Sequence, residues 1–311
     1  MDLAVFAGSS NVALAEAIAA AAGISLGQRV LARSPDGELQ VELQENVRAT
    51  DVFLVQPTGP PLDQSLMELF FLADACRRAG ANHITALTPY FGYARQDRST
   101  KSRHAIGARL IPDLMRSAGI GRVVAVDLHT ASIESAFGIA LEHLSSVPRF
   151  LGAIGRVNAD SVVVAPDLGA FRLAERYASA WGLPLAIVAK VRVSADRVIA
   201  QNLIGEVRGR KPIIIDDMII SGATIEAALG KVIDAGAVGE ATVIATHGLF
   251  AGTAMQRLAA LPITRLMVSD SLELLSQGRL PIERVSLAPL LSQTMLRLHS
   301  GEPLDDLYGH G

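Results

Sequence analysis

The chain has 311 residues, of which 50% are hydrophobic and 19% charged, a composition that excludes an intrinsically disordered protein and predicts two domains of roughly 150 residues each. The formal net charge of -3 gives no reason to expect a nucleic acid or an anionic membrane as a partner, so any anion site must be local. The single Cys76 excludes an intramolecular disulfide, the start of the chain lacks the basic region of a signal peptide, and no apolar run reaches the ~18 residues of a membrane span; a cytoplasmic protein is predicted.

Short apolar runs rich in Val and Ile alternate along the chain with amphipathic stretches. The apolar runs predict strands at 3–7, 28–33, 52–57, 83–88, 122–128, 161–166, 184–190, 212–217, 240–246, 265–269 and 284–287. The amphipathic stretches predict helices at 11–22, 62–79, 103–118, 170–181, 223–235, 252–260 and 289–300. Segment 38–44, ELQVELQ, alternates strictly and predicts one strand of a hairpin or flap with one wet face. The whole pattern predicts an α/β protein built from βαβ units, with a buried parallel sheet in each half.

A boundary near 145–157 divides the chain into similar halves, 1–147 and 148–311. Each half is expected to be a nucleotide-type α/β domain that binds ligands beyond the carboxyl ends of its strands. The last helix, 289–300, could pack back on the first half. The tail after it is predicted to be mostly loop.

The stretch from Lys211 to Gly230, KPIIIDDMIISGATIEAALG, carries the most chemical information. A buried strand delivers Asp216 and Asp217 to its carboxyl end, and a short loop with small residues then opens a helix. Such a loop lets backbone N–H groups approach a phosphate, and the acidic pair suits the vicinal hydroxyls of a ribose. Taken alone, the pattern fits equally an N-capped helix with a solvated acidic pair.

The stretch matches the pattern hydrophobic-Asp-Asp-x-x-x-[Thr/Ser]-Gly-x-Thr, and resembles the phosphoribosyl-binding motif of type I phosphoribosyltransferases and ribose-phosphate pyrophosphokinases. Five further segments resemble pyrophosphokinase signatures in order and spacing: QENVRATDVFLVQP (44–57), PYFGYARQDR (89–98), VDLHT (126–130), APDLGAFRLAERYA (165–178) and LAPLLSQTMLRLHSGE (287–302). The resemblance covers nearly the whole chain, whereas ordinary phosphoribosyltransferases lack the first half. It implies two type I phosphoribosyltransferase-like domains, with ATP on the first and ribose 5-phosphate on the second.

Cations gather after the predicted strand 83–88, at Arg95, Arg98, Lys101 and Arg103. Arg and Lys are the expected clamps for triphosphate oxygens, although a basic loop of this kind is often only solvated. The resemblance favours the first interpretation. It implies ATP-binding roles for seven residues: Asp36, Glu38, Arg95, Gln96, Asp97, Arg98 and His129.

His129 and Asp167 each follow a buried strand. One imidazole and one carboxylate hold Mg²⁺ only weakly, so phosphate oxygens and waters would have to complete its shell. A histidine at a strand end is otherwise usually just hydrogen-bonded. The resemblance implies that both residues are metal-associated and that Mg²⁺ is the cofactor.

The remaining roles follow from the resemblance. Lys190 and Arg192 are implied to be catalytic, as mobile cations that neutralise charge during transfer; otherwise they form an exposed basic hairpin. The ribose 5-phosphate site is implied to comprise Asp216, Asp217, Ser221, Gly222, Ala223 and Thr224.

The chain departs from the family at several positions. Ser34 replaces an aromatic residue that would lie against adenine, Val191 replaces the middle cation of Lys-Arg-Arg, and Ile220 replaces an acid. The helix entry at 103–109 differs from the Arg-Glu-Pro-Ile-Thr-Ala-Lys pattern, which puts inherited regulation by phosphate or ADP in doubt.

The implied activity is Mg-dependent transfer of the β,γ-diphosphoryl group of ATP to the anomeric hydroxyl of ribose 5-phosphate. The resemblance also implies a homo-oligomer, either a dimer or a hexamer built from dimers. Two alternatives stay open: a non-catalytic regulatory homologue, and a phosphoribosyltransferase that consumes phosphoribosyl diphosphate.

Overall fold

The computed structural model describes residues 2–98, 103–192, 198–274 and 280–308. The chain divides into two compact units. Unit 1 comprises Met1–Ser146, Ser271–Glu273 and Leu287–Gly311; unit 2 comprises Val147–Asp270 and Leu274–Ser286. The last segment of the chain therefore belongs with the first 146 residues.

Unit 1 is built on a five-stranded sheet of order β1-β4-β5-β6-β7, in which all neighbours are parallel. Its elements are β1 Leu3–Ala7, α1 Val12–Ala21, β2 Arg29–Arg33, β3 Leu39–Leu43, β4 Asp51–Val55, α2 Leu62–Arg78, β5 His83–Leu87, α3 Gly107–Ala118, β6 Arg122–Val126, the 3₁₀ helix η1 Ala131–Ala136, β7 Ala140–Leu144, α8 Ala288–Ser300 and the 3₁₀ turn η2 Asp305–Leu307.

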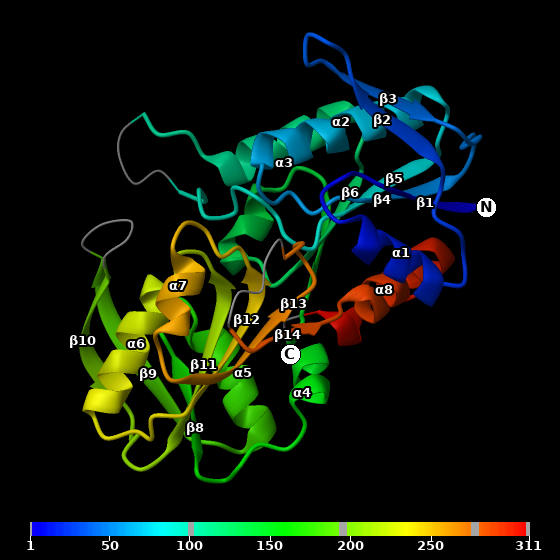
Figure 1. The fold of residues 1–311 in the computed structure, drawn as a ribbon. Helices are drawn as coiled ribbons and strands as arrows, with labels where there is room; N and C mark the ends of the chain where they lie inside the picture. Colours follow the sequence, from blue (N-terminus) through cyan, green and yellow to red (C-terminus); the bar gives the residue numbers. More distant parts are fainter. Residues whose placement is uncertain (1, 99–102, 193–197, 275–279, 309–311) are drawn as a thin grey trace. The chain divides into compact units, whose positions relative to one another are not determined.

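Helices cover both faces of the unit 1 sheet (Figure 1). Along β4, Val52 and Leu54 pack with α2 and α3 on one face, and Phe53 and Val55 pack with α1 and α8 on the other. Because successive side chains of a strand point to opposite faces, a strand covered on both sides must be apolar throughout. The four buried residues Val52, Phe53, Leu54 and Val55 of β4 have this character, and only Asp51 at the amino end of the strand is charged.

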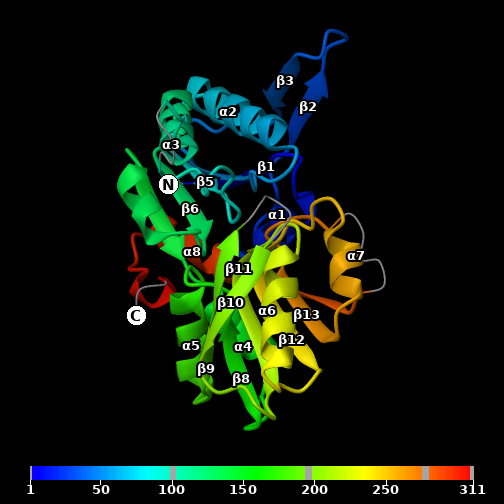
Figure 2. The same ribbon diagram turned by 90° about the vertical axis from the view of Figure 1, so that its left-hand side faces the viewer.

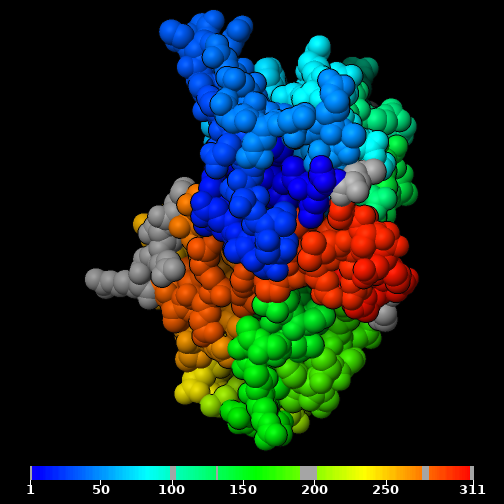
Figure 3. All heavy atoms as spheres, turned by 90° about the vertical axis from the view of Figure 1, so that its right-hand side faces the viewer, coloured from blue at the N-terminus to red at the C-terminus, as the bar shows by residue number. Residues whose placement is uncertain are grey.

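The C-terminal segment completes unit 1. Helix α8 lies beside α1, so that the last part of the chain adjoins the first at the surface (Figure 3). The tail then adds to the sheet edge, because the Ser145 amide donates to the Leu307 carbonyl at 3.1 Å and Tyr308 forms a bridge to Leu144. Burial, followed by its hydrogen bond to Glu142, raises the pKa of Tyr308 to about 12. The tail predicted to be mostly loop is thus partly ordered against β7.

Strands β2 and β3 form an antiparallel hairpin that projects beyond α2 (Figure 2). The alternating exposed and half-buried residues of β3 give the hairpin one wet face, as predicted from segment 38–44.

Unit 2 contains a seven-stranded sheet of order β10-β9-β8-β11-β12-β13-β14, parallel except for the β9–β10 pair. Its elements are α4 Val147–Ile154, β8 Ser161–Ala165, α5 Phe171–Trp181, β9 Leu185–Arg192, β10 Val198–Ile204, β11 Lys211–Ile219, α6 Ala223–Asp234, β12 Ala241–Gly248, α7 Ala254–Ala259, β13 Ile263–Ser269 and β14 Ile282–Val285. Helices α6 and α7 cover one face, and α4 and α5 the other.

The predicted fold class is confirmed: each unit is a largely parallel sheet flanked by helices. Strands β7 and β10, helix α4 and the 3₁₀ segments η1 and η2 were not predicted, and α4 occupies the expected boundary region 145–157. The predicted helix 103–118 begins only at Gly107, because Arg103 has a φ of 68° and Ile106 is extended. Among the described residues, no helix is long and apolar enough to cross a membrane.

Candidate active site

The loops that follow β4 and β5 are tied together at the carboxyl edge of the unit 1 sheet. Thr58, after β4, donates its amide to the Tyr90 carbonyl at 3.0 Å, and its hydroxyl accepts from the Gly92 amide at 2.7 Å. A Cβ atom at Gly92 would lie 2.4 Å from the Thr58 carbonyl oxygen, so only glycine permits this approach. Thr58 therefore sets the course of residues 89–98, called the cationic segment below.

Two arginines of the cationic segment stand at the surface. Arg95, Gln96 and Arg98 are exposed, and among the described residues neither arginine has an ion-pair partner. The Gln96 backbone is nevertheless fixed, since its amide donates to the Tyr93 carbonyl at 2.9 Å and its carbonyl accepts from the Ala108 amide of α3 at 3.2 Å. Guanidinium groups on an anchored turn suit the oxygens of a triphosphate.

Asp97 and His129, two predicted ATP residues from different motifs, lie in one place. The Thr130 hydroxyl donates to Asp97 Oδ2 at 3.1 Å, and the Ser132 hydroxyl donates to the same oxygen at 3.5 Å. Thr130 directly follows His129, which is half-buried after the end of β6. The structure thus joins the cationic segment to the VDLHT motif.

Asp36 and Glu38 lie in the exposed turn of the β2–β3 hairpin. Asp36 Oδ1 accepts from the Glu38 amide at 3.2 Å, and the Ser34 hydroxyl accepts from Gln40 Nε2 at 2.8 Å. Within the described part of the chain, no hydrogen bond or ion pair links this turn to His129. The structure therefore does not bring the two predicted adenine contacts to the other ATP residues.

Helix α2 contacts both the hairpin turn and the cationic segment. The sequence did not predict this connection. The Tyr93 hydroxyl donates to Asp63 Oδ1 at 2.7 Å, and this hydrogen bond is the first cause that raises the pKa of Tyr93 above its ordinary value. Asp63 also lines a cavity of about 660 Å³ together with Glu38, Met67 and Phe71. No spacing signal in the sequence pairs Tyr93 with Asp63.

In unit 2, the acidic pair lies inside β11, which continues to Ile219 rather than ending at residue 217 as predicted. Asp216 is buried and Asp217 half-buried, and the Asp217 amide donates to Asp216 Oδ1 at 3.0 Å. Two carboxylates at the carboxyl edge of a parallel sheet are placed to accept hydrogen bonds from substrate hydroxyls.

The loop 220–224 joins this strand to α6. Gly222 has a φ of 73°, in the left-handed region that favours glycine, and precedes the first helical residue, Ala223. Ser221 and Thr224 are half-buried on either side of it. The small residues allow a phosphate to approach the N-terminal amides of the helix.

Arg257 of α7 holds the same loop, although no motif predicted it. Its Nη1 donates to the Ser221 carbonyl at 2.8 Å, and its Nε lies 3.1 Å from Glu226 Oε2 of α6. The contact depends on the packing of α7 beside α6, and 36 residues separate Arg257 from Ser221. Only the folded structure reveals it.

Asp167 follows β8 at the carboxyl edge and is half-buried; its Oδ1 accepts from the Ala170 amide at 3.0 Å, just before α5. Because β9 runs parallel to β8, the carboxyl end of β9, with Lys190 and Arg192, reaches the same edge of the sheet. The side chains of Lys190 and Arg192 lie outside the described part of the structure, as does all of Lys101.

The described residues form no group of three or more His, Cys, Asp or Glu side chains that could hold a metal ion by themselves. His129 in unit 1 and Asp167 in unit 2 offer one imidazole and one carboxylate. Mg²⁺ is usually bound through one or two carboxylates together with substrate phosphates and waters. Each residue alone therefore offers a single ligand, which could serve only a magnesium ion that arrives with phosphates and waters.

A second cavity, of about 180 Å³, lies at the amino edge of the unit 2 sheet and contains none of the predicted site residues. Two of its cations are already paired: Lys211 Nζ lies 2.9 Å from Glu240 Oε2, and Arg265 Nε lies 2.6 Å from Glu283 Oε1. The candidate active site is therefore assigned to the carboxyl edges.

Comparisons with known proteins match both units. Residues 3–119 match the family model for the N-terminal domain of ribose phosphate pyrophosphokinase, and residues 144–250 match the phosphoribosyl transferase domain. The chain is 40% identical over 309 residues to a ribose-phosphate pyrophosphokinase of Gloeobacter violaceus, covering 98% of this chain and 93% of the relative. It is 40% identical over 302 residues to ribose-phosphate pyrophosphokinase 1 of Spinacia oleracea, covering 96% and 90%.

A solved structure agrees with the sequence relatives. The crystal structure of phosphoribosylpyrophosphate synthetase from Mycobacterium smegmatis superposes with a TM-score of 0.90 at 35% identity, covering 97% of this chain and 100% of that one. The resemblance expected from the motifs is thereby confirmed. The chain belongs to the ribose-phosphate pyrophosphokinase family.

Proposed function

We propose that this protein is a ribose-phosphate diphosphokinase that transfers the β,γ-diphosphoryl group of ATP to the anomeric hydroxyl of ribose 5-phosphate. The observation that carries the proposal is the hydrogen bond from Thr130 to Asp97, which joins the exposed arginines of the cationic segment to the His129 loop. Relatives that span nearly the whole chain and are named ribose-phosphate pyrophosphokinases support it.

The substrates are assigned to separate units. In unit 1, Arg95, Gln96, Asp97, Arg98 and His129 bind ATP, and the adenine contacts come from Asp36 and Glu38 on the hairpin of a second copy of the chain. In unit 2, the loop 220–224 binds the 5-phosphate at the start of α6, and Asp216 and Asp217 accept hydrogen bonds from the ribose hydroxyls.

The anomeric hydroxyl attacks the β-phosphorus in line with the bond to the α-phosphate, and AMP leaves. Catalysis consists mainly of positioning and charge neutralisation, to which Lys190 and Arg192 contribute. His129 and Asp167 are the residues that would hold Mg²⁺ bound with the nucleotide, and the metal would supply neutralisation of phosphate charge. No protein nucleophile takes part; the thiol of Cys76 is buried in α2, which raises its pKa to about 12.

Incubating the protein with Mg²⁺, ATP and ribose 5-phosphate tests the function. We expect AMP and phosphoribosyl diphosphate in equal amounts, and no AMP when ribose 5-phosphate is omitted. A regulatory homologue would release no AMP. A phosphoribosyltransferase would instead consume phosphoribosyl diphosphate without ATP, and it would leave the match of residues 3–119 unexplained.

Replacing Asp167 with Asn should raise the Mg²⁺ concentration that gives half the maximal rate, because a charged hard ligand becomes neutral. An asparagine oxygen can still accept from the Ala170 amide, so the start of α5 should be kept. Asp160→Asn is the matched control, because Asp160 is exposed and lies just before β8, at the opposite end of that strand from Asp167. Equal Mg²⁺ dependence in wild type and Asp167→Asn would reduce Asp167 to a structural role.

Replacing Ser34 with Phe should lower KM for ATP with little change in kcat, because an aromatic ring adds ~1–3 kcal/mol of stacking on a base. Within the described ranges the Ser34 hydroxyl accepts from Gln40 on the same hairpin, so the substitution costs this exposed hydrogen bond. ATP saturation at a fixed ribose 5-phosphate concentration measures the effect. An unchanged or higher KM would mean that adenine binds elsewhere.

We also propose that the protein acts in the cytoplasm as a homo-oligomer, either a dimer or a hexamer built from dimers. Met67 and Phe71 of α2 and Leu110 and Leu114 of α3 are large apolar side chains exposed to solvent, and their helices contact one another. Such side chains would be covered by a second copy. Light scattering that gives only the monomer mass at assay concentrations would refute the oligomer.

A further inference from the structure

The backbone turns sharply where β6 ends, and residues of β7 and the loop after it hold the turn. Asp127 has a φ of 42°, a backbone angle that residues other than glycine rarely adopt. Such an angle persists only where surrounding contacts impose it. Its amide donates to the Leu144 carbonyl at 3.0 Å, and its carboxylate accepts from the Ser146 amide at 3.2 Å. The next amide, that of Leu128, donates to Nε2 of His143 at 2.8 Å.

The last of these contacts determines the tautomer of His143. A backbone amide can only donate, so Nε2 must carry the lone pair and the ring proton must reside on Nδ1. Nδ1 lies 2.7 Å from Oε1 of Glu134 in η1, and this carboxylate oxygen accepts the hydrogen bond from Nδ1–H. The His143 side chain is only 12% exposed, whereas that of Glu134 is 38% exposed. Glu134 thus orients an imidazole whose other nitrogen accepts a hydrogen bond from one particular amide, that of Leu128.

His129 lies between two anchored neighbours. The residue before it, Leu128, is held through its amide by His143, and the residue after it, Thr130, is held through its hydroxyl by Asp97. From this geometry, and resting on the proposed function, we infer that His143 is a positioning residue that aims His129 at the nucleotide and its Mg²⁺. It acts on the backbone and does not itself touch substrate.

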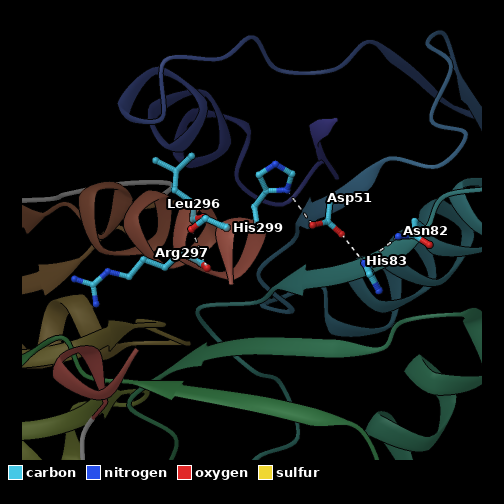
Figure 4. A network of polar contacts seen from close by, with 7 residues as sticks. Asp51, Asn82, His83, Leu296, Arg297 and His299 are labelled. Carbon is cyan, nitrogen blue, oxygen red and sulfur yellow. Dashed lines mark hydrogen bonds and ion pairs between the residues drawn. The ribbon is translucent and has the colours of Figure 1, made fainter. Parts of the chain in front are cut away.

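Unit 1 contains a separate histidine–carboxylate network, of two histidines and one aspartate, that serves as an internal comparison. Asp51 accepts from His83 at 2.9 Å and from His299 of α8 at 3.0 Å, at the amino ends of β4 and β5 (Figure 4). This network joins α8 to the sheet at the edge opposite the candidate site. His83 is 67% exposed, so replacing it probes the loss of a similar pair without disturbing the loop of His143.

The test compares His143→Leu with His143→Gln. Leu removes the acceptor and leaves the Leu128 amide unpaired, so kcat/KM for ATP should fall about 10- to 100-fold, the range for losing a partner that orients a metal ligand. KM for ribose 5-phosphate should not change. Gln carries an amide oxygen at similar reach and should restore most of the loss. The control His83→Leu should keep the wild-type value.

Three results would overturn the inference: wild-type kcat/KM for ATP in His143→Leu, no rescue by Gln, or a His143→Leu effect that is undiminished in a His129→Ala background. The last follows because a residue that acts only through His129 has nothing to position once that side chain is gone. If His143→Leu fails to fold, Glu134→Ala replaces it, since that half-exposed carboxylate can be removed without opening the core. Its expected effect is smaller and in the same direction, and an unchanged kcat/KM counts against the inference.

Failure of the proposed function would look different. A wild-type protein that forms no phosphoribosyl diphosphate would contradict the function. The positioning role could still be tested, because calorimetry would compare the affinity of wild type and His143→Leu for MgATP. Equal affinities there, with hydrogen exchange of the Leu128 amide also unchanged, would contradict the positioning role on its own.

Discussion

Replacing Lys190 with Ala is expected to lower kcat by about 10²-fold or more, the scale for removing one electrostatic stabiliser of a transition state. The same result is expected for Arg192→Ala. Both residues lie at the carboxyl end of β9, the edge at which β8 and β11 deliver Asp167 and Asp216. Charge that grows on the transferred phosphates would meet these cations there.

Steady-state kinetics at saturating substrates measures the effect, and thermal unfolding checks that the variants remain folded. Lys211→Ala is the matched control, because Lys211 begins β11 at the amino edge and pairs with Glu240. A Lys190→Ala or Arg192→Ala protein with wild-type kcat would remove that residue from the mechanism.

Replacing Gly92 with Ala is expected to raise KM for ATP by as much as about 10²-fold, since displacing a substrate-positioning loop by an ångström can cost that much. The new Cβ would lie 2.4 Å from the Thr58 carbonyl and 3.1 Å from Leu62, so the cationic segment has to move. The 2.7 Å hydrogen bond from the Gly92 amide to the Thr58 hydroxyl would be strained as well.

Gly121→Ala is the control for a glycine substitution in the same unit, because a Cβ there would meet nothing within 4 Å. ATP saturation curves and calorimetric MgATP binding should both show weaker binding of ATP by Gly92→Ala and wild-type binding by Gly121→Ala. If Gly92→Ala binds ATP as wild type does, the cationic segment is not anchored through Thr58.

The alternation of buried runs and amphipathic stretches was enough to predict the fold class, because strands covered on both faces have to be apolar throughout. The prediction failed for elements that are not apolar throughout. Strand β7, ALEHL, carries Glu142 and His143 and so lacks an apolar run, although both side chains are paired in the fold. Helix α4 lies in the region 145–157 where a boundary is predicted, and its Pro148 is compatible with the first turn of a helix.

The candidate site likewise contains residues that the sequence predicts and contacts that it does not. Residues within one motif, such as Asp216 and Gly222, could be predicted because a strand, a loop and a helix follow one another locally. Contacts that depend on the packing of distant elements could not be. Arg257 reaches Ser221 across 36 residues, and Thr130 reaches Asp97 across 33. Neither pairing leaves a spacing pattern in the sequence.

Ribose 5-phosphate labelled with ¹⁸O at its anomeric hydroxyl tests the central claim most directly. If that oxygen attacks the β-phosphorus, the label must appear in the bridge between the sugar and the diphosphate of the product, seen as an isotope shift of the attached phosphorus in the ³¹P spectrum. AMP must form without label. Loss of the label from the sugar, or formation of ADP in place of AMP, would contradict diphosphoryl transfer by this protein.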